Sequence, residues 1–205
     1  MKNRKRRLLC GVLCAVMLFA SAGSVLAVSC TNYSDWFKPS YNEMNELNLI
    51  PSEFAGYDLK KNITRGEMSV LAVHAYGLIT KNAIELERTD YFSDTTDKTI
   101  LEAYELGIVS GYTDGTFRPD APVTREQLAS ILYRYTLYRG QDVSAGETTS
   151  LTGYGDAQAV SSYALPAMRW ACGTGILQGA NGKLNPSGLA TRAQLAAMLH
   201  RYLTK

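Results

Sequence analysis

The feature that most constrains this chain is an internal repeat that occurs three times in 205 residues. Segment 108–129, which contains Gly-Tyr-Thr-Asp-Gly-Thr-Phe-Arg-Pro and then Thr-Arg-Glu-Gln-Leu, aligns with segment 176–196 once one residue is deleted. A more divergent copy at 47–68 keeps Thr-Arg-Gly-Glu-Met. The Thr-Arg pairs begin at positions 64, 124 and 191, which are 60 and 67 residues apart. Repeats of this length predict three similar structural units that pack on one another.

Within each unit the apolar pattern predicts two helices joined by a loop. In the second unit Ile100, Tyr104 and Ile108 recur at helical spacing, and a second amphipathic helix follows the loop. Because one helix pair cannot bury such an apolar face, the three helix-loop-helix units should share a core in a mainly α fold. The loop stretches 112–117 and 183–184 are expected to pair as very short strands.

The repeats also set the expected boundaries along the chain. A polar stretch rich in Gly, Ser and Thr at 139–150 is typical of a surface linker between the second and third units. The expected organisation is a leader at 1–27, a short segment at 28–32, unit 1 at 33–86, unit 2 at 87–138, the linker at 139–150 and unit 3 at 151–205.

The first 27 residues are predicted to be a cleaved signal peptide. Five Lys or Arg residues precede an apolar run from Leu8 to Phe19, and Val25-Leu26-Ala27 has the small-x-small shape that a signal peptidase accepts. The strongly apolar run is about a dozen residues long, which is short of the ~20 needed to span a bilayer. An uncleaved membrane anchor and a lipoprotein with its lipid at Cys30 are the alternatives.

Without the leader the chain is acidic. The leader holds 5 of the 21 Lys and Arg residues and none of the 19 Asp and Glu residues, so 16 basic residues face 19 acidic ones and the net charge is −3. A nucleic-acid partner therefore lacks electrostatic support. Once the leader is removed, no membrane attachment is expected.

Residues suited to catalysis or metal binding are sparse. Outside the leader only Cys30 and Cys172 remain, and an exported chain could join them in one disulfide. The two histidines, His74 and His200, lie far apart in the sequence, and no Cys-x-x-Cys pair is present. We therefore predict no catalytic group, no metal and no cofactor, and we do not expect an enzyme.

Each Thr-Arg pair fits the start of a helix. Thr64, Thr124 and Thr191 are each followed three residues later by Glu or Gln, the capping-box pattern. The arginine is unexpected, because a cation in the first turn faces the positive end of the helix dipole. Two explanations stay open: an anion site formed by the guanidinium and free helix amides, or an ion pair with a neighbouring unit, for example with its leading aspartate. The arginines concerned are Arg65, Arg125 and Arg192.

A helix led by Asp, then Gly-Ile-x-x-Gly, Asp-Gly-x-Phe-x-Pro and Thr-Arg-x-Gln/Glu, resembles the S-layer homology repeat. The resemblance covers roughly residues 33–203 and is specific in units 2 and 3, whereas unit 1 lacks the Asp-Gly-x-Phe-x-Pro segment. It implies three repeats in a pseudo-threefold domain. Such domains anchor surface proteins to pyruvylated secondary polysaccharides of a Gram-positive-type wall, which bind in grooves between neighbouring repeats.

The resemblance and the residue chemistry together define a candidate polymer site. The three Thr-Arg arginines and the acid that leads each unit are carried over from the family pattern. Trp170 could stack on a sugar ring or belong to the core. Gly111 and Gly179 could admit a ligand close to the backbone, although a turn with positive φ explains them as well. The candidate residues are Arg65, Arg125, Arg192, Asp35, Asp94, Asp156, Trp170, Gly111 and Gly179.

The resulting functional hypothesis is a secreted protein of the cell wall or cell surface that holds an anionic polysaccharide without catalysis. The alternative is a structural or adaptor protein that keeps the fold but binds other surface proteins. The divergence of unit 1 and the lack of an evident cargo domain favour that alternative.

Overall fold

The computed structural model describes residues 28–81 and 83–204, which form seven α-helices and four 3₁₀ helices. The mainly α class is confirmed, since this part of the chain holds isolated β-bridges but no extended strand. Of the two short strands expected in the loops, the second is reduced to a single bridge between Ala180 and Lys183. The predicted signal peptide lies outside the described residues. Within them, every helix is too short or too polar to cross a membrane.

The helices follow the repeats in order along the chain. The α-helices are α2 (Lys38–Glu46), α3 (Arg65–Thr80), α4 (Lys98–Glu105), α5 (Arg125–Tyr138), α6 (Ala145–Thr148), α7 (Leu165–Gly173) and α8 (Arg192–Leu203). The 3₁₀ helices are η1 (Asp35–Phe37), η2 (Ser52–Phe54), η3 (Ala157–Ala159) and η4 (Ser162–Ala164). The stretch 139–150, expected as a linker, contains α6, which packs on α7.

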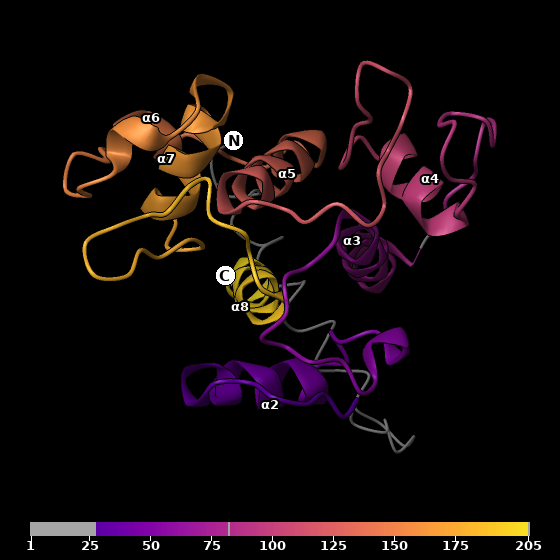
Figure 1. Cartoon of the computed structure of the whole chain (residues 1–205), viewed down its shortest axis with the longest axis horizontal. Helices are drawn as coiled ribbons and strands as arrows, with labels where there is room; N and C mark the ends of the chain where they lie inside the picture. Colours follow the sequence, from indigo (N-terminus) through magenta and orange to yellow (C-terminus); the bar gives the residue numbers. More distant parts are fainter. Residues whose placement is uncertain (1–27, 82, 205) are drawn as a thin grey trace, which may run out of the picture.

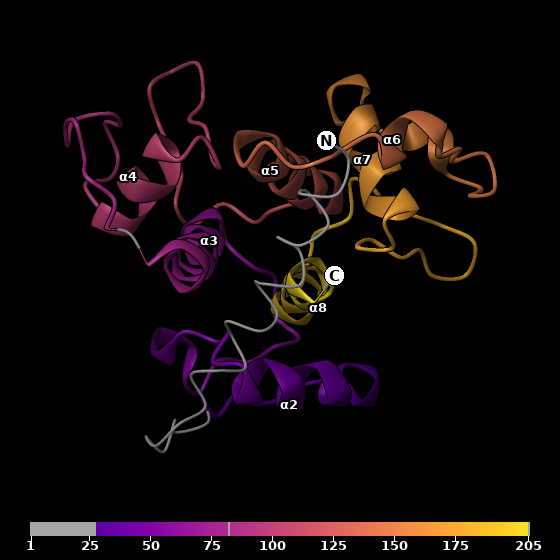
Figure 2. The same ribbon diagram turned by 180° about the vertical axis from the view of Figure 1, so that it is seen from behind.

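The second helices of the three units, α3, α5 and α8, lie together in the middle, and the first helices, α2, α4 and α7, lie outside them (Figures 1 and 2). Each outer helix packs on the inner helix of the preceding unit: α4 on α3, and α7 on α5. The ring closes because α2 of unit 1 packs on α8 of unit 3. This arrangement confirms the pseudo-threefold fold.

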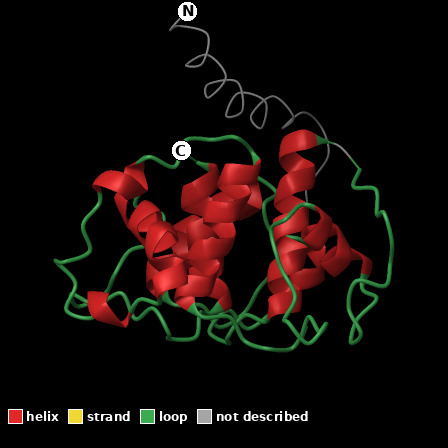
Figure 3. Ribbon diagram, turned by 90° about the horizontal axis from the view of Figure 1, so that it is seen from above, coloured by secondary structure: helices red, strands yellow, loops and turns green. Residues whose placement is uncertain are grey.

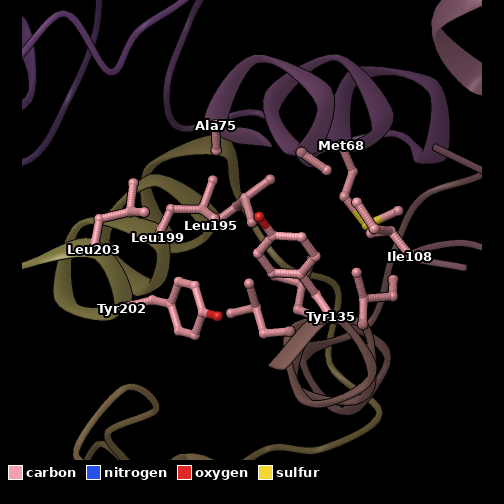
Figure 4. Close-up of a pocket in the computed structure, with 12 residues that line it drawn as sticks. Met68, Ala75, Ile108, Tyr135, Leu195, Leu199, Tyr202 and Leu203 are labelled. Carbon is pink, nitrogen blue, oxygen red and sulfur yellow. The ribbon is translucent and has the colours of Figure 1, made fainter. Parts of the chain in front are cut away.

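The apolar faces of α3, α5 and α8 meet at the centre of the ring. Met68, Leu128 and Leu195 are each about 98 % buried, with 2 %, 1 % and 2 % of their surface exposed. Figure 4 shows the small cavity that remains between the three helices. Its volume is about 20 Å³, enough for one water molecule, but its lining is almost wholly apolar, so we expect it to stay dry.

A closed ring of backbone hydrogen bonds joins the three units just before the inner helices. The amide of Ile63 donates to the carbonyl of Ala190 (2.9 Å), that of Ala190 to Val123 (2.8 Å), and that of Val123 to Ile63 (3.1 Å). This ring brings the amino-terminal ends of α3, α5 and α8 together. Figure 3 shows the loops gathered along this edge of the molecule.

The turn after the first helix has similar backbone geometry in all three units. Gly107 and Gly175 have positive φ angles of 65° and 71° at this turn. Asn48 takes the same place in unit 1 with φ 54°. Asparagine tolerates the left-handed region better than most residues with a side chain, so the helix can end in the same way without glycine.

Candidate functional site

The start of each inner helix is fully capped. Thr64, Thr124 and Thr191 each accept a hydrogen bond from the amide three residues on, and the Glu or Gln side chain there bonds back, so all three predicted capping boxes are confirmed. The two preceding amides are also occupied, because the loop of the next unit lies over them. In α3 they donate to the carbonyls of Ala121 and Pro119, at 3.0 and 2.8 Å.

The other two inner helices repeat this pattern. The first two amides of α5 donate to Gly188 and Pro186, both at 3.0 Å, and those of α8 to Lys61 and Leu59, at 2.9 and 3.0 Å. The expectation of free amides that would help to bind an anion is therefore wrong. In the closed ring of units, backbone carbonyls of the next unit accept the hydrogen bonds that an anion would have accepted.

The guanidinium groups of Arg65 and Arg125 also bind the loop of the next unit. Arg65 donates from Nε to the carbonyl of Phe117 (2.8 Å) and from Nη2 to that of Ser110 (2.7 Å). Arg125 makes the two equivalent bonds in unit 3, at 2.7 and 3.0 Å. Burial lowers the pKa of both side chains. The arginines thus join neighbouring units as one hypothesis expected, but through carbonyls rather than through a leading aspartate.

Arg192 is placed differently. Its Nε donates to Oε2 of Glu67 (3.1 Å), its Nη2 donates to Oε1 of the same carboxylate, and its Nη1 donates to the carbonyl of Asp58 (3.1 Å). The hydrogen bond that Arg192 donates to Glu67 raises the pKa of Arg192. This contact is an ion pair between units 3 and 1, and its acid is the capping residue of α3.

The leading aspartates of units 2 and 3 hold their own loops. Asp94 accepts hydrogen bonds from the amides of Phe117 and Arg118, both at 2.7 Å, and Asp156 accepts the two equivalent bonds at 2.8 and 2.7 Å. These backbone bonds lower the pKa of both carboxyl groups. The alignment of Asp35 with them is not reproduced, since Asp35 is exposed within η1.

In unit 1 a backbone contact replaces this carboxylate. The amide of Thr31 donates to the carbonyl of Tyr57 (2.9 Å), and the amide of Leu59 donates back to Thr31 (3.1 Å). The loop of unit 1 is therefore held by a short extended pairing rather than by a leading aspartate, and its own Asp58 accepts hydrogen bonds from the Asn32 side chain and the Lys60 amide.

Trp170 belongs to the core and is not a sugar-stacking residue. Only 2 % of its surface is exposed, and its ring packs edge-on against Tyr133 and Tyr202. Of the two roles considered for this residue, the structure shows the core.

The two candidate glycines are required by packing within their own units. A Cβ atom at Gly111 would lie 2.4 Å from the ring of Phe92, and one at Gly179 would lie 2.6 Å from the ring of Tyr154. Neither glycine has a positive φ, so that explanation is wrong. In units 2 and 3 the leading aromatic residue packs on the glycine, as its repeated occurrence in the sequence could have indicated.

A groove of about 410 Å³ lies where the three units meet around α3, α5 and α7. Unit 1 contributes Arg65, unit 2 contributes its loop and one face of α5, and unit 3 contributes the start of α7. The lining residues are Arg65, Ser110, Gly111, Tyr112, Gln127, Ser130, Ile131, Tyr133, Arg134, Tyr163, Pro166 and Ala167.

Two cations converge on one residue of this groove. Arg65 binds the carbonyl of Ser110, and Arg134 donates from Nη1 to the Ser110 hydroxyl at 3.3 Å. Arg134 is exposed, and an arginine stays protonated in proteins, so the groove carries positive charge. The sequence-based candidates include Arg65 and Gly111 but not Arg134. A signal for Arg134 exists, because the tail Leu-Tyr-Arg-Tyr recurs at Arg201 as Leu-His-Arg-Tyr.

Two exposed tyrosines complete the groove, and the sequence interpretation missed both. Tyr112 is 37 % exposed and Tyr163 is 62 % exposed. The guanidinium carbons of Arg65 and Arg118 lie 4.9 and 4.0 Å from the centre of the Tyr112 ring, so cation–π contacts hold this ring in place. Exposed aromatic faces beside guanidinium groups are suited to a sugar ring that carries a carboxylate.

Within the described residues, the cysteines and the potential metal ligands are the remaining candidates for other chemistry. Cys30 and Cys172 are both free thiols, so the disulfide considered from the sequence is not formed. Burial raises the pKa of Cys172 to about 11, which keeps this thiol protonated and unreactive near neutral pH. Within the described residues, no three His, Cys, Asp or Glu side chains are placed to hold a metal ion.

The ring of helical units and its groove define a repeat protein with a candidate binding site. Two segments, residues 91–129 and 153–196, match the family model of the S-layer homology domain. They correspond to units 2 and 3. These two segments are therefore S-layer homology repeats, and unit 1 has a similar arrangement of an outer and an inner helix.

Named proteins share parts of this chain. An "Endoglucanase" of a Bacillus species is 29% identical over 84% of this chain, which is 18% of the relative. A "Cellulosome-anchoring protein" of Acetivibrio thermocellus is 31% identical over 37% of the chain and 18% of its own length. "Cell surface glycoprotein 1" of the same organism is 34% identical over 46% of the chain and 4% of its own length. The chain thus spans less than a fifth of each of these relatives.

Proposed function

We propose that this protein attaches non-covalently to the cell surface by binding an anionic cell-wall polysaccharide in the groove around α3, α5 and α7. The observation that carries the proposal is the convergence of Arg65 and Arg134, from two different units, on Ser110 between two exposed tyrosines. A pyruvylated sugar is the ligand that fits best, because a pyruvyl ketal places a carboxylate directly on the sugar ring.

The chemistry of the groove supports this ligand class. Arg134 has donors available for a ligand, since an arginine carries five N–H groups. Arg134 makes two long hydrogen bonds, to the Ser110 hydroxyl (3.3 Å) and to the Ser130 carbonyl (3.4 Å). A carboxylate would offer it a bidentate, charge-assisted partner. Tyr112 and Tyr163 can cover a sugar ring while their hydroxyl groups bond to its polar edge.

The relatives support attachment to the cell surface. Two carry the words "cell surface" or "cellulosome-anchoring" in their names, and the region shared with the "Endoglucanase" is less than a fifth of that protein. A small region shared by proteins with such different names fits a common attachment module better than a common catalytic centre. We therefore propose that the chain binds and does not catalyse.

The direct test is binding of residues 28–205 to cell-wall sacculi before and after chemical removal of the secondary polysaccharide. We expect binding that is lost with the polysaccharide, and that Arg134→Ala weakens at least about tenfold, the usual effect of removing one charge-assisted pair. Arg88→Ala is the matched control, because Arg88 is exposed, pairs with Asp90 and lies outside the groove. Failure of the wild-type protein to bind sacculi that carry pyruvylated polysaccharide would overturn the proposal and favour the adaptor function.

A further inference from the structure

Glu126 is a buried carboxylate in the first turn of α5, and the predicted motif does not account for it. Only 6 % of its surface is exposed. Its Oε2 accepts a hydrogen bond from the amide of Ser161 (3.0 Å), and its Oε1 accepts one from the Ser161 hydroxyl (2.7 Å). Oε1 also accepts a longer bond of 3.4 Å from the hydroxyl of Tyr163. Glu126 therefore binds the turn that leads into α7, and this turn belongs to the next unit.

The other two inner helices have no carboxylate at the same position. The residue after the Thr-Arg arginine is Gly66 in α3 and Ala193 in α8. Neither has a side chain that could accept a hydrogen bond. A buried carboxylate without partners would be strongly unfavourable, so its presence at one corner alone indicates that this corner needs the contact.

The turn that Glu126 holds carries one wall of the groove. Ser161 immediately precedes η4, and Tyr163 is the middle residue of that short helix. Tyr163 lines the groove together with Arg134, and its side chain is 62 % exposed, so packing alone does not fix its ring. The hydrogen bonds at Ser161 fix the backbone two residues before the ring, and the bond to the Tyr163 hydroxyl limits its rotation.

We propose that Glu126 is a positioning residue that presents Tyr163 as the preformed aromatic wall of the polysaccharide groove. The claim that Glu126 tightens polysaccharide binding rests on the proposed function. The claim that Glu126 positions Tyr163 does not. An exposed ring that is ordered in advance loses less conformational freedom when a ligand arrives. The side of the groove formed by the turn before α7 is accordingly held by a carboxylate that the equivalent positions of α3 and α8 lack.

The structural part is tested on the free protein by amide hydrogen exchange and NMR. In Glu126→Ala we expect the Ser161 amide to lose its protection from exchange and the ring signals of Tyr163 to shift. Glu126→Gln, which keeps one acceptor, should retain part of the protection. Glu102→Ala is the control for removing a buried carboxylate elsewhere, since Glu102 is 8 % exposed and pairs with Lys98. Unchanged Ser161 exchange and unchanged Tyr163 signals in Glu126→Ala would overturn the proposal.

The functional part is tested by a double-mutant cycle of binding to purified pyruvylated wall polysaccharide. If Glu126 acts through the ring, Glu126→Ala and Tyr163→Ala should each weaken binding about fivefold, and the double variant should bind no more weakly than Tyr163→Ala alone. Effects that multiply in the double variant would overturn the positioning role. Absence of wild-type binding would instead refute the proposed function, while the exchange experiment would still decide whether Glu126 holds Tyr163. Should Glu126→Ala fail to fold, Ser161→Ala removes the hydroxyl bond to Oε1 and leaves the amide bond to Oε2, so a smaller shift of the Tyr163 ring signals is expected.

Discussion

Two corners of the ring carry the same Thr-Arg motif and use it in different ways. At the corner between units 1 and 2, Arg65 binds two backbone carbonyls of the loop in unit 2 and lines the groove. At the corner between units 3 and 1, Arg192 binds the carboxylate of Glu67 and one carbonyl of unit 1. The charge of Arg65 is left without a carboxylate, whereas the charge of Arg192 is neutralised.

The difference follows from the loops rather than from the arginines. The loop of unit 2 reaches Arg65 with the carbonyls of both Ser110 and Phe117. Unit 1 has lost the Asp-Gly-x-Phe-x-Pro segment and offers only the carbonyl of Asp58. Glu67, where the other units have glutamine, supplies the missing acceptors. Glu67 at the capping position therefore compensates for the missing loop segment of unit 1. We call the corner between units 3 and 1, where Glu67 pairs with Arg192, the joint.

The largest expected effect is on stability at the joint. Glu67→Ala should lower the free energy of unfolding by about 2–4 kcal/mol, because it leaves Arg192 only partly exposed and without its carboxylate. Gln127→Ala, at the same helix position in unit 2, removes only a capping contact and should cost about 1 kcal/mol. Urea unfolding measures both values. Equal losses in the two variants would show that the joint has no special role.

A smaller effect is expected on binding, with the order of the corners reversed. Arg65→Lys keeps the positive charge but loses the planar fork that spans two carbonyls, so polysaccharide binding should weaken about tenfold. Arg192→Lys should leave binding within about twofold, because Arg192 faces Glu67 and lies outside the groove. Isothermal titration with purified polysaccharide compares the two. A greater loss of binding from Arg192→Lys than from Arg65→Lys would show that the polysaccharide does not bind in the groove that we propose.

The smallest effect concerns acid. Backbone hydrogen bonds lower the pKa of Asp94 and Asp156 below the ordinary value of 3.8, so the folded state favours their ionised form. Their contribution to stability is therefore complete above that ordinary pKa and is lost as the pH falls through the lower folded values. Asp94→Asn with Asp156→Asn should flatten the acid side of the stability profile measured by thermal unfolding.

Hydrogen exchange can compare the loops within the same experiment. The loops of units 2 and 3 should loosen at low pH before the loop of unit 1, because Asp94 and Asp156 hold their backbone, whereas backbone bonds with Thr31 also hold the loop of unit 1. Simultaneous loosening of all three loops would contradict the distinction between the units.

Much of the fold could be predicted because it depends on local patterns. The three units, their helix pairs and the three capping boxes follow from residues within a few positions of one another, such as Thr124 and Gln127. The equivalence of Asn48 with Gly107 also follows from local geometry, since both end a helix with positive φ.

The candidate site was predicted only in part, for a different physical reason in each case. Arg65 and Gly111 do line the groove. Arg134, Tyr112 and Tyr163 were missed. A tyrosine in a loop or turn looks the same in the sequence whether it faces solvent, core or groove, and the partners that bring Arg134 into the groove come from distant parts of the chain. Trp170 shows the converse: its burial depends on α5 and α8, which contact it through Tyr133 and Tyr202.

The sequence by itself determined that this chain is three helical repeats with capped inner helices, because capping and amphipathic spacing act over one or two turns of the chain. Only the tertiary structure decided that each outer helix packs on the preceding unit, that α2 closes the ring on α8, and that Arg65 and Arg192 meet different partners. Those partners lie about 45 to 134 residues away along the chain. Their identity depends on how loops of unequal length reach across a closed ring, which no local pattern records.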